Sequence, residues 1–496
     1  MKFKIRRVTG AKPFMVLVAM VCASSLTVAQ DWMSTECGDA GCGTEGCVGS
    51  DSDQSNRIDV EAIFNGLAGD DSVFGSLKNL EAGGITYSVG GELRHRFMNE
   101  ANRLRPPGGN AEYSLWRFTP HLKVQFSDRV GAFVEGIDAS AFQEGDDPYS
   151  PLPIDVNRLD FLRYYAEFTL FSDETSSLKY RYGRQFLKYG SQRLLSPLGW
   201  SNTFRNFEGH KLMYKSGDWA VDGFLMSSVN GAAGGSGFGI TSLDSADNNR
   251  QISGVYSTYS GLENSKLDLY WLYFDEGNAA ANRQDGHRHT LGARLGGSKP
   301  VKECDKVIGT WSWDFEGAYQ FGGDNFASTN SDVSAGMLSA NVGYTFNNLK
   351  WTPSIKGFYY WGSGSDQTGG NDNNTFFTLY PLGHAYWGLI DNFSGQNLQD
   401  VGATFSVKPH KKLSLSASYH FFTKANDNDF TYNIAGAPLG TIGGNGEIGQ
   451  ELDLLATIPV TKNFNIQTGY FWFFYGDEFA ARDDARQFYV QTTLKF

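Results

Sequence analysis

Short stretches in which apolar and polar residues strictly alternate recur along this 496-residue chain and constrain its fold more than any other feature. In the clearest stretch, residues 311–321, Trp311 and Trp313 share one face, while Ser312 and Asp314 share the other. Two further stretches show the same alternation, at residues 116–126 and 487–496. A period of two predicts a β-strand with two different faces. A soluble sandwich would show it as well, so alternation alone leaves the fold class open.

The lengths of the connections between these stretches favour one class. Eight are short, at residues 127–129, 172–177, 216–218, 261–264, 298–309, 347–350, 409–411 and 461–463. Nine are longer and rich in Gly, Asn and Asp, at residues 100–112, 143–157, 187–204, 230–250, 275–286, 322–335, 362–397, 424–448 and 476–485. Short and long connections alternate, as do the periplasmic turns and external loops of outer-membrane barrels.

These connections join about eighteen strands. No linker divides the region after residue 85, so we expect residues 86–496 to form one all-β domain, a transmembrane antiparallel β-barrel with both termini in the periplasm. The alternative is a soluble all-β solenoid or tandem sandwich. A barrel of this kind would lie in the cell outer membrane, with lipid around its apolar face.

The first 29 residues have the features of a secretory signal peptide. Basic residues from Lys2 to Lys12 precede an apolar run from Phe14 to Val28, and Ala29 completes a small-residue cleavage site. The run is shorter than the roughly 20 residues that a membrane-spanning helix needs. The sequence therefore predicts export from the cytoplasm.

Charge and spacing exclude several functions. The signal peptide holds five of the 42 Lys and Arg residues and no acid, so the remaining chain has 37 basic and 54 acidic residues, a net charge near −17. This excess argues against nucleic acid as a partner, because phosphate binding needs a basic surface. His287 and His289 share a strand face but lack a third ligand, and Ser236 lacks the spacing of a nucleophile elbow. We expect no enzyme activity, cofactor or metal.

Residues 30–85 differ from the rest and are expected to form an acidic periplasmic tail. They contain Cys37, Cys42 and Cys47, which would form disulfides in an oxidising compartment. Cys304 falls in a predicted periplasmic turn, on the same side of the membrane. One hypothesis is that a tail cysteine pairs with Cys304 while the other two pair together. The alternative is that Cys304 has no partner.

An eighteen-strand barrel encloses an aqueous channel, so the polar strand faces should line a pore. Basic residues predicted to point inward lie mostly on the first six strands: Arg94, Arg96, Arg117, Lys123, Arg163, Lys179, Arg181, Lys211, Lys215, Arg288 and Arg294. Inward acids come later: Asp314, Glu316, Asp400, Glu451 and Asp453. A basic arc would attract anions despite the negative total charge. The alternative is that these charges pair with one another across the water.

Two long loops are too apolar for simple exposure to water. The third places Arg193 and Arg205 near Trp200, and the seventh contains His384, Tyr386 and Trp387 among other aromatic residues. We expect both loops to fold into the pore or over its mouth. Aromatic rings stack on sugar faces and guanidinium groups bind carboxylates, so this composition suits acidic carbohydrate. The alternative is that the aromatic residues only pack the loops on the barrel rim.

Three segments resemble the alginate-export family of outer-membrane barrels: GRQFLKYGSQRLLSPLGWSNTFRNFEG at 183–209, LYPLGHAYWGLIDNFSGQNL at 379–398 and ELDLLATIPVTKNFNIQTGYFWFFYGDEF at 451–479. The resemblance covers roughly residues 86–496 and excludes the cysteine-containing tail. It implies an eighteen-strand barrel whose Arg-lined constriction passes an anionic uronate polymer. It also implies Arg184, Arg193 and Arg205 as substrate contacts.

The expected function is an outer-membrane channel for anionic polysaccharide or sugar acids, with an Arg-containing constriction formed by inward-folded loops. Its partners would be membrane lipid, the anionic saccharide and periplasmic export components. One alternative is a general porin with a mild anion preference. Another is a barrel that conducts nothing and has a structural or surface-binding role.

Overall fold

The computed structural model describes residues 77–104, 109–147, 149–230, 243–277, 286–324, 331–366, 372–440, 442–444 and 446–496. The chain divides into two units, residues 1–69 and 70–496, and all described residues belong to the second. The predicted signal peptide and most of the predicted tail, with Cys37, Cys42 and Cys47, lie outside the described residues.

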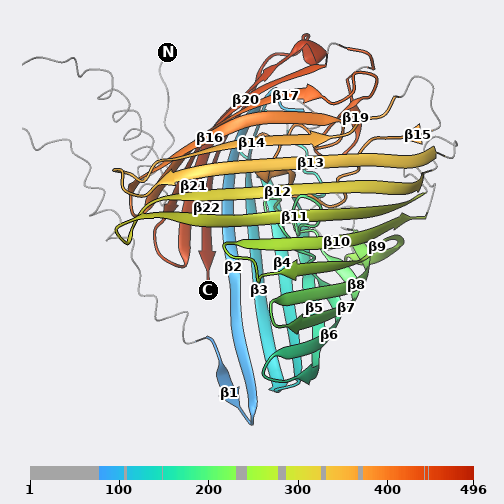
Figure 1. Ribbon diagram of the computed structural model, residues 1–496, viewed down its shortest axis with the longest axis vertical. Coiled ribbons are helices and arrows are strands. Elements are labelled where there is room, and N and C mark those ends of the chain that lie inside the picture. The colour runs from blue at the N-terminus through green and yellow to red at the C-terminus, as the bar shows by residue number, and fades with distance from the viewer. Residues whose placement is uncertain are drawn as a thin grey trace, which may run out of the picture. The chain divides into compact units, whose positions relative to one another are not determined.

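Eighteen long antiparallel strands in the described ranges form one closed sheet (Figure 1). The first nine are β2 (Ile85–Ala101), β3 (Ala111–Ser127), β4 (Val130–Gln143), β5 (Asn157–Ser172), β6 (Ser176–Gln185), β7 (Phe207–Ser216), β8 (Trp219–Asn230), β9 (Ser245–Tyr259) and β10 (Ser265–Glu276). The others are β11 (Gly286–Glu303), β12 (Lys306–Asp324), β13 (Ser331–Phe346), β14 (Ser354–Gly362), β16 (Leu398–His410), β17 (Leu413–Lys424), β20 (Glu447–Pro459), β21 (Phe464–Tyr475) and β22 (Ala485–Lys495). The last strand pairs with the first, from Glu92 opposite Lys495 to Ala101 opposite Arg486, and this pairing closes the barrel.

The remaining described elements are short. β1 (Leu80–Ala82) pairs with the start of β2, β15 (Asp372–Asn373) runs parallel to β13, and β18 (Thr431–Tyr432) pairs with β19 (Pro438–Leu439). Two single-turn 3₁₀ helices are η2 (Gly383–Ala385) and η3 (Asp477–Phe479). Among the described residues, no helix is long and apolar enough to cross a membrane.

The predicted eighteen-strand antiparallel barrel is confirmed, with short turns at one end and long loops at the other. The predicted long turn over residues 298–309 is wrong. Instead of a loop over 298–309, the ladder continues to a two-residue turn at Cys304 and Asp305, whose φ angles are +46° and +64°. Positive φ at both positions is typical of a tight type I′ hairpin. Apolar–polar alternation stops before this turn. Both faces of the strand end meet water there, so neither face requires apolar residues.

The Cys304 thiol is exposed in this turn and has no disulfide partner among the described residues. Its predicted disulfide partners lie outside the described residues, so the proposed tether between tail and turn stays a prediction.

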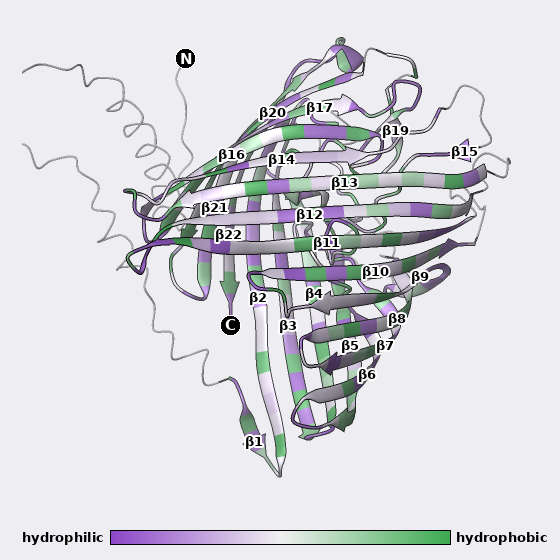
Figure 2. Ribbon diagram, viewed as in Figure 1, coloured by the Kyte–Doolittle hydropathy of each residue, from purple (hydrophilic) through white to green (hydrophobic). Residues whose placement is uncertain are grey.

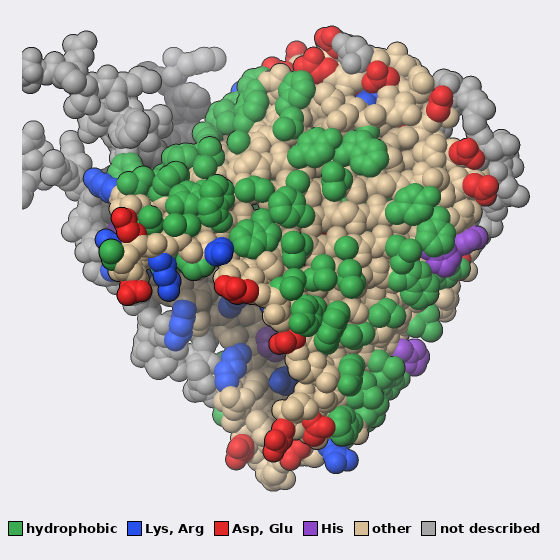
Figure 3. Space-filling model, in the orientation of Figure 1, with side chains coloured by type: hydrophobic (Ala, Val, Ile, Leu, Met, Phe, Trp, Pro, Cys, Tyr) green, Lys and Arg blue, Asp and Glu red, His purple; other side chains and the backbone are tan. Residues whose placement is uncertain are grey.

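The two faces of the wall differ sharply in burial. Hydrophilic and hydrophobic residues alternate along the strands in Figure 2, and hydrophobic side chains spread over the outer face in Figure 3. Leu93 and Trp116 are 38% and 42% exposed, while their neighbours Arg94 and Arg117 are only 2% and 3% exposed. The outward side chains therefore meet lipid, and the inward polar ones are covered by protein inside the barrel.

Candidate channel constriction

Two long loops fill much of the barrel interior. Loop 3 (residues 186–206) joins β6 to β7, and loop 7 (residues 363–397) joins β14 to β16. Leu195 of loop 3 and Trp387 of loop 7 are almost fully buried and belong to one apolar cluster with side chains of the inner wall. Burial of this apolar surface holds the loops inside the lumen, since the same side chains would be unfavourable in water.

Loop 3 and loop 7 are hydrogen-bonded to each other through their backbones. The Ser196 N–H donates to the Tyr380 carbonyl, and the Tyr380 N–H donates to the Leu194 carbonyl, both at 2.9 Å. The Leu382 N–H donates to the Gln192 carbonyl at the same distance. This short parallel pairing makes one unit of two loops that lie far apart in sequence, so displacing either loop must break bonds to the other.

Two predicted inward arginines hold loop 3 by its carbonyl oxygens. Arg94 donates to the carbonyls of Gly199 and Ser201, at 3.0 and 2.6 Å, and Arg117 donates to the same two carbonyls at 3.2 and 2.8 Å. Arg117 also pairs with Glu92 at 2.5 Å. Arg94 and Arg117 are directly opposite each other on β2 and β3. The carbonyl oxygens and Glu92 offset the repulsion between the two charges, which are thus used in holding the loop.

The indole ring of Trp200 lies between two nitrogen-containing groups. The Arg96 guanidinium carbon is 3.4 Å from the ring centroid, and the His384 ring stacks at 3.6 Å with planes inclined by 8°. Two groups this close to one ring cannot overlap on the same side, so they occupy opposite faces. Arg96 also donates to the Trp200 carbonyl at 2.7 Å. This stack joins strand β2, loop 3 and loop 7.

Arg193 is neutralised by acids of the wall. It donates to Asp314 at 2.7 Å and to Glu316 at 2.5 Å, and its guanidinium group lies over the Tyr386 ring. Burial alone would lower the pKa of Arg193, but Glu316 and Asp314 raise it above the ordinary value. Arg193 is therefore held by two wall carboxylates, while its Nε has no hydrogen-bond partner among the described residues.

Four other predicted pore residues lie on the wall away from this junction. Arg163 pairs with Glu135, Arg181 pairs with Glu167, and Lys123 is exposed on the same face of β3 as Arg117. Arg184 is buried and donates to the carbonyls of Phe161 and Asp244. Among the described residues, these four line neither of the two cavities that adjoin the loops.

The predicted aromatic residues of loop 7 have different surroundings. His384 donates to or accepts from Asp391 through Nδ1 at 2.9 Å, and Tyr386 donates to the Ser191 carbonyl of loop 3. Trp387 is 1% exposed and packs edge-on against Tyr360. His384 and Tyr386 therefore reach the channel interior, whereas Trp387 belongs to the apolar core.

A cavity of about 310 Å³ lies on the long-loop side of the paired loops; we call it the outer cavity. Its charged lining comprises four arginines and two aspartates: Arg96, Arg103, Arg205, Arg250, Asp155 and Asp391. Trp200, Tyr380 and His384 contribute ring faces to the same space. Its charged lining therefore has an excess of positive charge.

A second cavity of about 370 Å³, the inner cavity, lies on the short-turn side. Its lining includes two basic residues, Arg193 and Lys356, and three acids, Asp314, Asp400 and Asp453. His384 lines both cavities and so marks the level at which they meet. The net charge of the lining is thus positive in the outer cavity and negative in the inner cavity. The sequence had predicted a separation of charge between early and late strands, with no change along the barrel axis.

Arg205 and Arg250 form an incompletely neutralised pair in the outer cavity. Their guanidinium carbons are 5.3 and 5.6 Å from the centroid of the Tyr380 ring. Arg205 donates to the Pro381 carbonyl at 3.2 Å, while Arg250 faces Glu276 at 3.4 Å. Burial lowers the pKa of Arg205 to about 10, and Arg250 lowers it as well. Among the described residues, Glu276 is the one carboxylate within ion-pair distance of either guanidinium group.

Arg103 and Arg250 line this cavity but were absent from the predicted site. Arg250 lies two residues before Ile252 and therefore on the same strand face, but this was hidden because residues 230–250 were assigned to a loop. The strand β9 in fact begins at Ser245 and makes Arg250 a wall residue. Arg103 lies in an irregular segment after β2, where no periodic pattern marks the inward direction.

Comparison with known proteins identifies the family. The alginate export family profile matches residues 86–492, most of the chain and all but the end of the barrel. The chain belongs to the alginate export family. The segments that carried the resemblance, 183–209, 379–398 and 451–479, correspond to loop 3 with its flanks, the inner part of loop 7, and β20 with β21. No curated protein matches the chain in sequence.

Solved structures agree on the fold of this alginate export family member. OccK8 (OprE) of Pseudomonas aeruginosa aligns with a TM-score of 0.52 at 14% identity, over 83% of this chain and 98% of its own. OccAB1 of Acinetobacter baumannii gives a TM-score of 0.54 at 12% identity, covering 82% and 96%. OccAB2 of the same species gives 0.54 at 10% identity, covering 83% and 98%. Family and fold are those of outer-membrane channels, a class distinct from enzymes, and the protein is an outer-membrane barrel.

Proposed function

We propose that this member of the alginate export family conducts acidic saccharides, from sugar acids to uronate-containing polymers. The observation that carries the proposal is the pair of arginines, Arg205 and Arg250, against the Tyr380 ring in the outer cavity. In the part of the chain that the structure describes, the pair has one carboxylate within ion-pair distance, Glu276, whose oxygen lies 3.4 Å from the Arg250 Nε. A ligand carboxylate between the two guanidinium groups would relieve their mutual repulsion and accept charge-assisted hydrogen bonds.

The other groups in the outer cavity suit the rest of a sugar acid. The ring of Phe377 can pack against the C–H groups of a pyranose ring, while Gln396 and Asp391 can bond its hydroxyls. The family description, alginate export, favours outward passage of an anionic uronate polymer. A polymer requires loop 3 and loop 7 to separate, whereas a single sugar acid requires only a shift of the His384–Trp200 stack.

Planar-bilayer recordings test the proposal. Oligouronates of two to four units should block the single-channel current of the wild-type protein, and the double variant Arg205→Ala, Arg250→Ala should lose about tenfold or more in apparent affinity for block. Arg205→Ala and Arg250→Ala are also recorded singly, and Arg181→Ala is the matched control for each, because it removes one positive charge from a wall position paired with Glu167.

Three other outcomes would contradict the proposal. Anion preference without any block by oligouronates would indicate a general porin. Equal loss of block in Arg181→Ala would show that only overall charge matters. The absence of current, even after deletion of residues 363–397, would favour a barrel with a structural or surface-binding role.

A further inference from the structure

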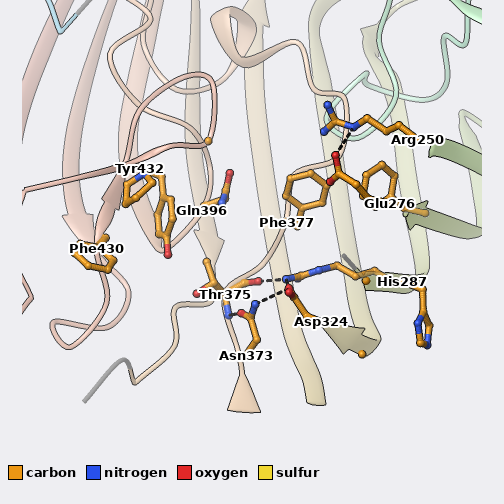
Figure 4. Close-up of a pocket in the computed structure, with 16 residues that line it drawn as sticks. Arg250, Glu276, His287, Asp324, Asn373, Thr375, Phe377, Gln396, Phe430 and Tyr432 are labelled. Atoms are coloured by element: carbon orange, nitrogen blue, oxygen red, sulfur yellow. Dashed lines mark hydrogen bonds and ion pairs between the residues drawn. The ribbon is translucent and has the colours of Figure 1, made fainter. Parts of the chain in front are cut away.

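A third cavity adjoins the outer cavity at the long-loop end of the barrel. We call this space of about 270 Å³ the side pocket (Figure 4). It is bounded by the ends of β9 to β12, by loop 7 and by residues 430–438. It shares four lining residues with the outer cavity: Arg250, Phe377, Gln396 and Gly436. Arg250 therefore stands at the junction of the two spaces.

A rigid polar network forms one side of the side pocket. Arg288 pairs with Asp324 at 2.8 Å and donates to the Thr375 carbonyl at 3.0 Å, while Asn373 donates to Asp324 at 2.9 Å (Figure 4). Asp324 is 4% exposed, and its second carboxylate oxygen, Oδ1, has no hydrogen-bond partner among the described residues. This buried acceptor is a ready partner for a hydroxyl donor, because an unsatisfied buried carboxylate oxygen is costly.

Aromatic side chains form the remaining walls. Phe377 lies near Glu276, while Phe430 and Tyr432 lie on the other side of the pocket beside Gln396 (Figure 4). The Phe274 ring packs against Phe377, with centroids 5.3 Å apart, and lies under the Arg250 guanidinium group. Phe377 is fixed by two hydrogen bonds between its backbone and the Gln320 side chain, at 2.9 and 2.8 Å. Ring faces together with amide and carboxylate groups are the surroundings that a sugar unit with several hydroxyls requires.

The charges of the side pocket are balanced, unlike those of the outer cavity. Arg288 is paired with Asp324, and the other arginine of the pocket, Arg250, is shared with the outer cavity, where it would already bind the acidic unit. Without an unpaired positive group on this side, a second ligand carboxylate would meet Asp324 and Glu276 and be repelled. The side pocket therefore favours a neutral unit, whereas the outer cavity favours an acidic one.

We propose that the side pocket is a subsite for a neutral sugar unit, next to an acidic unit held by Arg205 and Arg250 in the outer cavity. The inference rests on the proposed function and specifies the substrate further. The preferred ligand is a mixed saccharide in which a uronic acid is linked to a neutral hexose, in preference to a uniform uronate chain.

Current-block measurements with four probes test this inference: glucose, glucuronic acid, diglucuronic acid, and glucuronic acid β-linked to glucose. For the wild-type protein we expect the mixed disaccharide to block at an about tenfold lower concentration than glucuronic acid, since a second occupied subsite adds affinity. The concentration of diglucuronic acid needed for block should be less than about twofold lower than that of glucuronic acid. Glucose alone should block weakly.

Variants of Phe430 locate the effect. Phe430→Ala removes an aromatic wall of the side pocket, and it should abolish the advantage of the mixed disaccharide without changing block by glucuronic acid. Phe430→Tyr keeps the ring and should retain the advantage. The matched control is Phe421→Ala, which removes the same side chain from a 37% exposed position on the lipid side.

The results separate this inference from the proposed function. If glucuronic acid blocks the current and diglucuronic acid blocks it as strongly as the mixed disaccharide or more strongly, the neutral subsite is overturned and the proposed function stands. The neutral subsite would also be overturned if the probes block the Phe430→Ala variant as they block the wild type, or if the variant loses block by every probe equally. The absence of block by glucuronic acid and both disaccharides would overturn both.

Discussion

The imidazole ring of His384 stacks on the indole ring of Trp200, with centroids 3.6 Å apart and planes inclined by 8°. Trp200 belongs to loop 3 and His384 to loop 7, so this contact joins the two inward loops at the point where the outer and inner cavities meet. Arg96 covers the other face of the indole and ties the stack to strand β2. Opening the channel here requires these rings to move apart.

Trp200→Ala should raise the single-channel conductance and increase current fluctuations, because the variant removes the ring that His384 and Arg96 share. The loss of this part-buried ring should also destabilise loop docking by about 3 kcal/mol. Conductance and noise in planar bilayers measure the effect. Trp116→Ala, at a 42% exposed position on the outer face, is the control and should conduct like the wild type. Unchanged conductance in Trp200→Ala would show that the stack is no part of the constriction.

Arg94→Ala should release loop 3 from the wall, because the Ser201 and Gly199 carbonyls lose their shortest charged donor. Arg117 still donates to both carbonyls, so the variant loses two of the four charged hydrogen bonds that they accept from the wall, at a cost of about 1–3 kcal/mol. The variant should therefore be cut faster by trypsin after Lys188 or Arg193 while the barrel itself stays intact. Arg181→Ala, whose partner Glu167 belongs to the wall, should be cut at the wild-type rate. Equal protection of both variants would contradict the role of Arg94 as a loop anchor.

Gly388→Ala should disturb the docking of loop 7 on the wall. The φ angle of Gly388 is +82°, and an added Cβ would lie 2.4 Å from the Glu451 carboxylate, which accepts a hydrogen bond from the Ile390 N–H at 2.9 Å. Strain and overlap together should cost at least about 1–3 kcal/mol of stability. The midpoint of heat unfolding on unboiled gels measures this loss. Gly217→Ala shares the positive φ, at +51°, but has open space around it, so it should lose less. An equal fall of the unfolding midpoint in both variants would show that overlap with Glu451 adds nothing to the strain.

The turn at Cys304 and Asp305 should accept a better turn sequence. Both residues have positive φ, a conformation that costs residues other than Gly, Asn and Asp about 1–2 kcal/mol. The double variant Cys304→Asn, Asp305→Gly should therefore raise the free energy of unfolding in urea by about 1 kcal/mol. Cys304→Ser removes the thiol and keeps the strain, so it serves as the control. A loss of stability in both variants would instead point to a structural role for the thiol.

The barrel could be predicted because its signals are local. Alternation over a few residues marks a strand such as β12, and the lengths of adjacent connections mark the two ends of the barrel. The same local signals failed where the surroundings of a strand change. Residues 298–309 show no alternation because both faces of the strands meet water there. The predicted start of β9 lay too far along the chain, because residues 245–250 have the polar composition of a loop.

The candidate site was predicted only in part. Arg96, Arg205 and His384 do meet in the outer cavity, and the apolar composition of loops 3 and 7 indicated that they avoid water. Which arginines remain available to a ligand did not follow from the sequence. Arg94 and Arg117 contact backbone carbonyls more than 80 residues away, and Arg193 contacts acids of β12 more than 120 residues away.

Strand pattern and connection length are thus enough to specify an outer-membrane barrel of eighteen strands with two loops inside, because membrane and water sort side chains by polarity at every position. The pairing of loop 3 with loop 7 and the isolation of Arg205 and Arg250 beside Tyr380 arise only in the folded barrel. Their partners are backbone carbonyls and distant side chains. Every residue carries a backbone carbonyl, so the residue type does not indicate which carbonyl an arginine will contact. The closed barrel determines the contact by bringing distant segments together.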